Sequence, residues 1–197
     1  MQQLLSAAFD VFLIHGFSGT SLDDIARTAH VAKRTIYERF GSKGGLFAAA
    51  VQRSATELVG RFPKADRAGG NLGNDLEHIG RAVLEFVLQP KSLAIYRLVV
   101  GEAQRQPGLA HQFYENGPAR AVAAVADLLA VYLRRNGLPA GDAIALARQF
   151  IGLVVLEVHQ RAVLGTLPTM STMAVRKHVE VATKAFLSTL STLRPTP

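Results

Sequence analysis

The sequence predicts an all-α protein. Apolar residues recur at spacings of three and four, as on one face of a helix, and no stretch shows the strict alternation of a half-buried strand. Prolines stand at the starts of the predicted helices and glycines near their ends, where each residue type is best tolerated. The chain has 197 residues, 49% hydrophobic and 19% charged, which indicates a folded globular protein rather than a disordered one.

The first two helices have clear start and stop signals. The first is predicted over about residues 2–14, because Gly16 offers a left-handed stop directly after it. Ser21 is a good N-cap for the second helix, and Asp24 lies three residues on, in the position of a capping box.

A break at His30-Val31 separates the second helix from a short third helix over about residues 33–39. Ile36 of that helix is expected to point inward, so its basic and polar residues face out. Ser42 is the expected N-cap of a fourth helix. A compact helix pair whose second helix is basic suits insertion into the major groove of DNA.

The rest of the chain predicts six further helices after a polar, glycine-rich loop over 63–75. Their expected ranges are about 74–89, 91–105, 108–115, 118–136, 140–165 and 171–193. The prolines that mark their boundaries are Pro90, Pro107, Pro118, Pro139 and Pro168.

Composition limits the possible function classes. The chain has no cysteine, which excludes disulfides and thiolate metal sites. We expect a cytoplasmic protein without a membrane partner, because Asp10 interrupts the first apolar run and no uncharged run reaches about 18 residues. The net charge of +7 favours an anionic partner, although it could serve solubility alone. Residues 32–43 hold four Lys/Arg and one acid, which favours nucleic acid.

The last two predicted helices suggest a dimer. Residues 150–158 are apolar almost all round, and a helix with no polar face must be buried on more than one side. Two such helices per subunit could form a four-helix bundle across a two-fold axis, and a dyad also suits DNA half-sites. The alternative is that both helices simply complete a monomeric core.

The N-terminal part resembles the DNA-binding domain of tetracycline-repressor (TetR) family regulators over about residues 2–50. The residues that carry the resemblance are Gly16-Phe17, Thr20-Ser21, Asp24-Ile25-Ala26, Val31, Lys33, Thr35-Ile36-Tyr37, Phe40, Ser42-Lys43 and Leu46-Phe47. The segment RLVVGEAQRQPGLAHQFYENGPAR, residues 97–120, also looks like a C-terminal ligand domain of one branch of that family.

The resemblance implies about nine helices, a homodimer, a palindromic operator and release of DNA when a small-molecule effector binds. It implies a helix-turn-helix DNA-binding domain over 1–47, with the motif at about 21–40, and an effector-binding and dimerisation domain over 48–197. It implies no cofactor and no metal.

The resemblance also implies roles for individual residues. The implied phosphate contacts are Thr20, Ser21, Tyr37 and Lys43. The implied base readers are Lys33, Arg34 and Thr35, since Lys and Arg favour guanine O6 and N7 and a Thr methyl can touch a thymine methyl. Arg39 is a further candidate contact. Ser21 could instead be only a cap, Tyr37 a core-edge aromatic, and Arg39 a solvated surface residue.

The sequence departs from the family pattern at four positions around the motif. His30 stands where glycine is usual at the turn, and Ala32 stands where a capping Ser or Thr is usual. Gly44 and Gly45 follow Ser42-Lys43 where acidic residues often complete a capping box. Because glycine costs about 1 kcal/mol relative to alanine inside a helix, we hypothesise a soft start of the fourth helix.

The effector pocket is expected between the later helices and to be mostly apolar. The candidate lining residues are Phe86, Tyr96, Phe113, Tyr114, Phe150 and Glu157. Core packing is the alternative for each aromatic residue, and Glu157 could simply pair with Arg161, four residues on. His111 and Glu115 also lie four apart, as metal ligands can, but a solvated surface explains them better.

Two other function classes compete with a DNA-binding regulator. A helical small-molecule-binding protein or an enzyme is the first, but the sequence has no phosphate-loop pattern and no convincing nucleophile–base pair, and GGNLGND follows no strand. A membrane-surface protein is the second, and Arg134-Arg135 is the best basic feature it could use.

Overall fold

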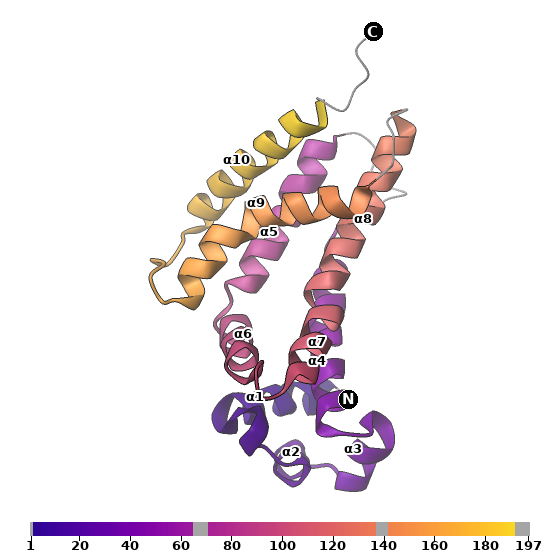
Figure 1. Cartoon of the computed structure of the whole chain (residues 1–197), viewed down its shortest axis with the longest axis vertical. Coiled ribbons are helices and arrows are strands. Elements are labelled where there is room, and N and C mark those ends of the chain that lie inside the picture. Colours follow the sequence, from indigo (N-terminus) through magenta and orange to yellow (C-terminus); the bar gives the residue numbers. More distant parts are fainter. Residues whose placement is uncertain (1, 65–70, 137–141, 192–197) are drawn as a thin grey trace. The chain divides into compact units, whose positions relative to one another are not determined.

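The computed structural model describes residues 2–64, 71–136 and 142–191. The described residues form ten α-helices and no strand, which confirms the all-α class and is close to the expected helix number (Figure 1). The helices are α1 (Gln2–Gly19), α2 (Leu22–Ala29), α3 (Lys33–Phe40), α4 (Lys43–Val59), α5 (Leu72–Val87), α6 (Pro90–Glu102), α7 (Pro107–Asn116), α8 (Pro118–Arg135), α9 (Ala143–Val163) and α10 (Thr172–Ser191). The predicted boundary at Pro139 and the predicted end of the last helix at 192–193 lie outside the described residues.

The capping box predicted for α2 is present, but α1 does not end at about residue 14, since it runs to Gly19 with a kink at Gly16. The backbone of α1 leaves helical geometry at Gly16, where φ is 72°, in the left-handed region that glycine adopts without strain. Ser21 and Asp24 form a complete capping box at the start of α2. His30 ends α2 in the left-handed conformation, with φ 54° and ψ 44°. A non-glycine residue occupies this turn at some conformational cost.

The connections on either side of α3 also follow the sequence. Ala32 is the N-cap residue of α3 and provides no side-chain hydrogen bond, as expected. The Ser42 hydroxyl accepts a hydrogen bond from the Gly45 N–H at 3.0 Å, which confirms Ser42 as the cap of α4. A Cβ atom at Gly45 would overlap the Phe40 carbonyl oxygen. Close packing therefore explains why glycine occupies position 45. Gly45 no longer supports the hypothesis that α4 has a soft start.

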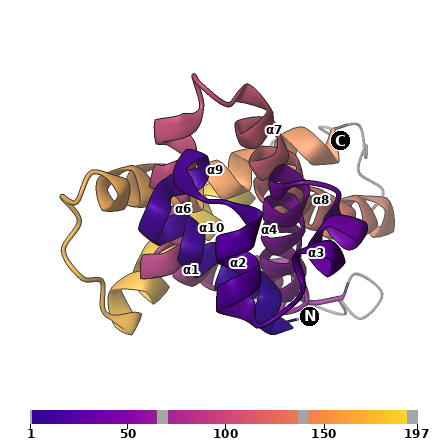
Figure 2. The same cartoon turned by 90° about the horizontal axis from the view of Figure 1, so that it is seen from below.

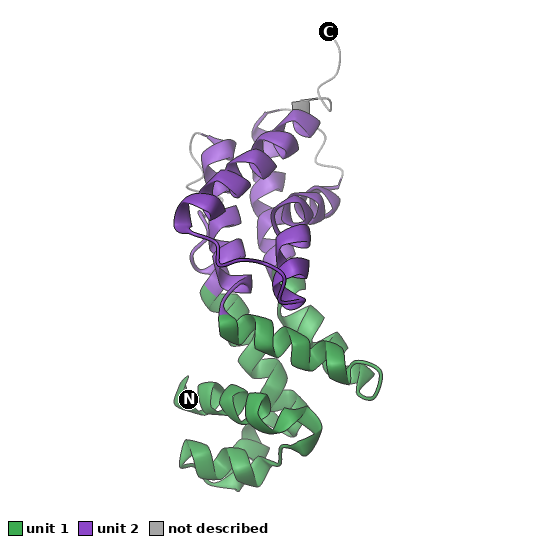
Figure 3. Cartoon of the chain, turned by 90° about the vertical axis from the view of Figure 1, so that its left-hand side faces the viewer, with its two compact units in different colours: residues 1–57, 90–120 green, residues 58–89, 121–197 purple. Residues whose placement is uncertain are grey.

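The described chain divides into two compact units (Figure 3). Unit 1 comprises residues 1–57 and 90–120, so α6 and α7 belong with the N-terminal helices (Figure 2). We predicted a boundary at residues 47/48, and the units divide the chain differently. The physical reason is that Ile95, Val99 and Leu109 are buried in the same core as the apolar residues of α1 and α4. Rings of Phe9, Phe12, Phe17 and Phe47 pack together at the centre of that core.

Unit 2 comprises residues 58–89 and 121–197, and its described helices are α5, α9, α10 and most of α8. Its core contains Phe150 and Phe186, whose ring centroids lie 5.4 Å apart. Helices α5 and α10 approach each other closely at Gly80, which has no side chain. A Cβ atom added there would lie only 2.7 Å from Val179 Cγ1. Unit 2 is therefore a separately packed helical body.

Candidate nucleic-acid interface

Helix α3 presents a polar face and buries a narrow apolar one. Ile36 is fully buried in the core of unit 1. The predicted outward-facing residues are all exposed: Lys33, Arg34, Thr35, Tyr37 and Arg39. Tyr37 retains 64% of its surface exposed, so it is not the core-edge aromatic of the alternative interpretation. The structure thus brings these five residues together on one short helix, available to a partner.

Two cations of α3 are already paired with carboxylates. Lys33 Nζ lies 2.7 Å from Asp23 Oδ2 of α2, and Arg34 Nε lies 2.6 Å from Glu38 Oε1 on α3 itself. Arg39 takes part in none of the ion pairs of the described residues. Sequence reasoning missed both acidic partners, although the four-residue spacing of Arg34 and Glu38 was a usable signal. Exposed pairs of this kind contribute about 0–1 kcal/mol, so they open at little cost.

Acidic residues elsewhere in the N-terminal segment offset most of the basic excess of residues 32–43. Residues 1–57 hold six Lys/Arg and five Asp/Glu, so this segment contributes one of the chain's seven net positive charges. Asp23, Asp24 and Glu38 lie beside the exposed cations of α2 and α3. The candidate interface therefore depends more on hydrogen bonds from individual side chains than on a strong positive electrostatic potential.

Thr20 does not lie where a phosphate contact requires it. It is 3% exposed, and its hydroxyl donates to the Gly16 carbonyl oxygen at 2.7 Å, so the side chain closes the end of α1. Ser21 is exposed, but its hydroxyl accepts from the Asp24 N–H and donates to the Asp24 carboxylate at 2.6 Å. The hydroxyl–carboxylate bond, then the Ser21 N–H, lowers the pKa of Asp24. The structure thus favours the capping role for Ser21.

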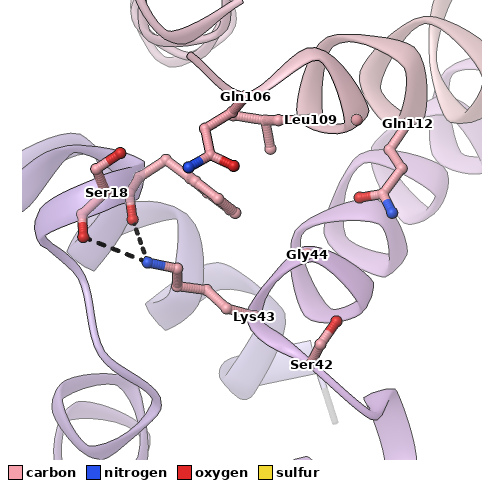
Figure 4. Close-up of a pocket in the computed structure, with 9 residues that line it drawn as sticks. Ser18, Ser42, Lys43, Gly44, Gln106, Leu109 and Gln112 are labelled. Atoms are coloured by element: carbon pink, nitrogen blue, oxygen red, sulfur yellow. Dashed lines mark hydrogen bonds between the residues drawn. The ribbon is translucent and has the colours of Figure 1, made fainter.

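Lys43 also departs from the expected phosphate contact. Its ammonium group donates to the Phe17 carbonyl oxygen at 2.6 Å, with a longer contact to Ser18 at 3.4 Å (Figure 4). It also donates to the Thr20 carbonyl oxygen at 2.7 Å. The same group lies 4.7 Å from the centroid of the Phe17 ring. Burial lowers the pKa of Lys43, and the nearby Glu102 carboxylate opposes that shift. Its three donors are used inside unit 1, where they satisfy carbonyls at the end of α1.

Glu102 of α6 is a buried carboxylate that holds the same end of α1. It is 9% exposed, and its Oε2 accepts a hydrogen bond from the Ser18 hydroxyl at 2.9 Å. Arg105 Nε lies 3.7 Å from the same carboxylate oxygen. Since an unpaired buried carboxylate is costly, these partners stabilise the packing of α6 against α1.

An open depression lies beside Lys43 within unit 1. Its lining comes from the ends of α1, α4 and α7, and Figure 4 shows the side chains around it. The lining residues are Phe17, Ser18, Ser42, Lys43, Gly44, Gln106, Gly108, Leu109 and Gln112. None of the six predicted effector-pocket residues is among them.

The predicted effector residues do not form one group. Phe150 is fully buried against Phe186, as core packing requires, and Phe86 is half-buried in unit 2. The other three aromatic residues belong to unit 1, where Tyr96 and Phe113 make a ring contact and Tyr114 is 48% exposed. Glu157 is exposed on α9 and pairs with Arg161 at 3.1 Å, so the simpler alternative explains it. Among the described residues, no three His, Asp or Glu side chains converge as metal ligands.

Helices α9 and α10 carry exposed apolar side chains. The most exposed on and just after α9 are Leu156 at 70% and Leu164 at 68%, and on α10 they are Met173 at 71% and Val181 at 61%. Helix α9 is long and apolar enough to cross a membrane by length and composition, a test that helices of soluble proteins also pass. The main apolar stripe of α10, which includes Val179 and Phe186, is buried in the core of unit 2, as the monomeric alternative predicts. The side chains that stay uncovered in the monomer lie elsewhere on α9 and α10.

Comparison with known proteins identifies the family. Residues 4–50 match the tetR family of bacterial regulatory proteins, and residues 74–189 match the C-terminal domain of AefR-like transcriptional repressors. The HTH-type transcriptional activator FasR of Mycolicibacterium smegmatis is 32% identical over 157 residues, which cover 79% of this chain and 68% of the relative.

Solved structures of regulators have the same fold. The flavonoid-responsive regulator FrrA is 33% identical, with a TM-score of 0.77, and the match covers 95% of both chains. A TetR regulator from Agrobacterium tumefaciens is 27% identical, with a TM-score of 0.76, and the match covers 95% of this chain and 93% of that one. The chain belongs to the TetR family of transcriptional regulators, with an N-terminal helix-turn-helix domain that binds DNA and a C-terminal ligand-binding domain.

Proposed function

We propose that the chain is a repressor that binds a palindromic operator as a homodimer and releases it when a small-molecule effector binds. The observation that carries this proposal is the surface of α3, where five polar and basic residues are exposed around a single fully buried residue, Ile36. A short, well-anchored helix of this kind fits the major groove. We further propose that the protein acts in the cytoplasm and has no enzymatic activity.

The residues of α3 divide into two roles. Lys33, Arg34 and Thr35 stand at the front of the helix, where side chains of a recognition helix reach base edges. Tyr37 and Arg39 offer a hydroxyl and a guanidinium to backbone phosphates. Lys43 is left out of this set, because its ammonium group is bound to carbonyl oxygens within unit 1.

The homodimer is proposed from the uncovered apolar side chains of α9 and α10. Pairing of these helices across a two-fold axis would bury Leu156 and Val181, which are 70% and 61% exposed in the monomer. A dyad would place two copies of α3 about 34–36 Å apart, one turn of DNA. An effector that prefers a different spacing would lower operator affinity by its differential binding energy.

The effector is proposed to be a small apolar or aromatic molecule. Support comes from the relative FrrA, which by its name responds to flavonoids. Phe86, half-buried in unit 2, remains a candidate contact. A panel of flavonoids added to the protein–operator complex tests this proposal, because an effector should release the DNA.

Repression is preferred to activation on a simple argument. Occupying a promoter blocks transcription without any further partner, whereas activation requires contact with the transcription machinery. The matched relatives include both an activator and AefR-like repressors. A reporter gene behind the selected operator distinguishes the two, since a repressor lowers its expression and an activator raises it.

The deciding experiment is selection of genomic DNA fragments by the purified protein, followed by sequencing. The proposal predicts enrichment of a palindrome whose half-sites lie about one helical turn apart. A helical small-molecule-binding protein without a DNA role would enrich no sequence. Absence of enrichment from DNA of the source organism would contradict the proposed function.

A further inference from the structure

Glu38 binds Arg34 through one edge of the guanidinium group, at Nε, and leaves the terminal edge of that group open. Glu38 Oε1 lies 2.6 Å from Arg34 Nε, and the two residues are one helical turn apart on the exposed face of α3. The side chains are 87% and 57% exposed, so both stand on the surface that faces DNA under the proposed function. The hydrogen bond is made by the Nε–H, so the edge between the two terminal amino groups is not used by it.

This arrangement suits recognition of a guanine. Bidentate reading of guanine requires two N–H groups in one plane, directed at O6 and N7. A guanidinium held through Nε keeps its plane fixed and offers its terminal edge. A free arginine would have to order its long side chain on binding, which reduces the advantage of the correct base.

Glu38 should also lower the affinity of the protein for DNA. A carboxylate beside the phosphate backbone weakens binding to every sequence, because the field of DNA is negative. The Arg34 guanidinium offsets that repulsion only where it keeps its pairing, and specificity grows when wrong sequences are penalised.

We propose that Glu38 is a specificity-determining residue of this regulator: it holds Arg34 to read one guanine and lowers affinity for all other DNA. The inference rests on the proposed function, in which α3 reads base edges. Asp23 provides the matched comparison. It pairs with Lys33 at 2.7 Å, but an ammonium group has no plane to fix.

The test measures dissociation constants for the selected operator, its single-base variants and an unrelated duplex at one salt concentration. Arg34→Ala first identifies the base pair that Arg34 reads. Glu38→Ala should then lower discrimination at that same base pair about tenfold and tighten binding to the unrelated duplex. Asp23→Asn should tighten non-specific binding but leave that discrimination unchanged. The double variant should discriminate no worse than Arg34→Ala alone.

Other outcomes overturn the inference in distinguishable ways. If Glu38→Ala kept full discrimination at the base pair that Arg34 reads, the Arg34–Glu38 ion pair would have no role in recognition. Loss of preference at a different base pair would mean that Glu38 itself reads a base, such as cytosine through N4. An Arg34→Ala variant with unchanged preferences at every position would overturn the reading role of Arg34 as well. Glu38→Gln, which keeps the side-chain shape, guards against a folding defect and should show a smaller effect in the same direction.

Discussion

Lys43 Nζ donates a hydrogen bond to the Phe17 carbonyl oxygen at 2.6 Å, across 26 positions of the chain. The bond joins the first turn of α4 to the end of α1, and Thr20 accepts from the same ammonium group. Lys43 therefore helps to hold α1 and α4 of the helix-turn-helix domain together. The ammonium group adds a short, charge-assisted bond to the Phe17 carbonyl, whose backbone bond from the Thr20 N–H is long at 3.4 Å.

Replacing Lys43 with methionine should therefore reduce stability. We expect a loss of about 1–2 kcal/mol in the free energy of unfolding, from the lost charge-assisted bonds at a helix end. Urea unfolding of Lys43→Met and wild type measures this difference. Lys33→Met is the matched control, since Lys33 is exposed and its loss should leave stability within about 0.5 kcal/mol. If Lys43→Met unfolds like wild type and loses affinity for all DNA alike, Lys43 contacts phosphate after all.

The two glycines at the start of α4 should respond in opposite ways to alanine. At Gly45 an added methyl group would overlap the Phe40 carbonyl oxygen, so Gly45→Ala should destabilise the protein by about 1–3 kcal/mol. At Gly44 the nearest atom is the Gln112 side-chain oxygen at 3.2 Å, on a side chain that can move. Gly44→Ala should therefore stabilise by up to about 1 kcal/mol, through better helix propensity. Equal thermal shifts for the two variants would contradict the close approach at Gly45.

The capping box of α2 should make stability depend on acidic pH. The Ser21 hydroxyl and then its backbone N–H lower the pKa of Asp24 below 3.8. The unfolded chain binds the proton more readily, so the stabilisation is complete above the ordinary pKa and is lost as pH falls through the lowered one. The urea midpoints of wild type and Asp24→Asn should therefore differ by a constant amount at higher pH and converge as pH falls below about 4. A difference that stays constant as pH falls well below about 4 would show that the Asp24 charge does not contribute.

The exposed apolar face of unit 2 should control the oligomeric state. Leu156→Glu places a charge at a position that is 70% exposed in the monomer and buried in the proposed dimer. Sedimentation equilibrium should show a dimer for wild type and a weakened or monomeric variant. Val100→Glu is the matched control, because Val100 is 55% exposed on α6 of unit 1 and should leave the dimer intact. A dimer unaffected by Leu156→Glu would place the interface elsewhere.

Local signals in the sequence predicted the helices and their ends well. Gly16, Ser21 with Asp24, and Ser42 each act through groups within four residues, so their caps follow from neighbours along the chain. The exposure of Lys33 to Arg39 around a buried Ile36 also follows from helical periodicity.

Features set by distant parts of the chain could not be predicted in this way. The carbonyl partners of Lys43 lie 23 to 26 positions away, and the core that holds α6 and α7 in unit 1 depends on Ile95 and Leu109 meeting α1 and α4. Five of the six predicted effector residues are aromatic residues on helices, a pattern that core residues such as Phe150 share.

The most direct test of the central claim, that α3 reads DNA in a symmetric dimer, is a salt titration of binding to the selected operator and to a scrambled duplex. Two subunits should bind per operator, the logarithm of the affinity should fall linearly with the logarithm of salt concentration, and Arg34→Ala should reduce the preference for the operator. A monomeric protein with equal affinity for both duplexes at every salt concentration would contradict this claim.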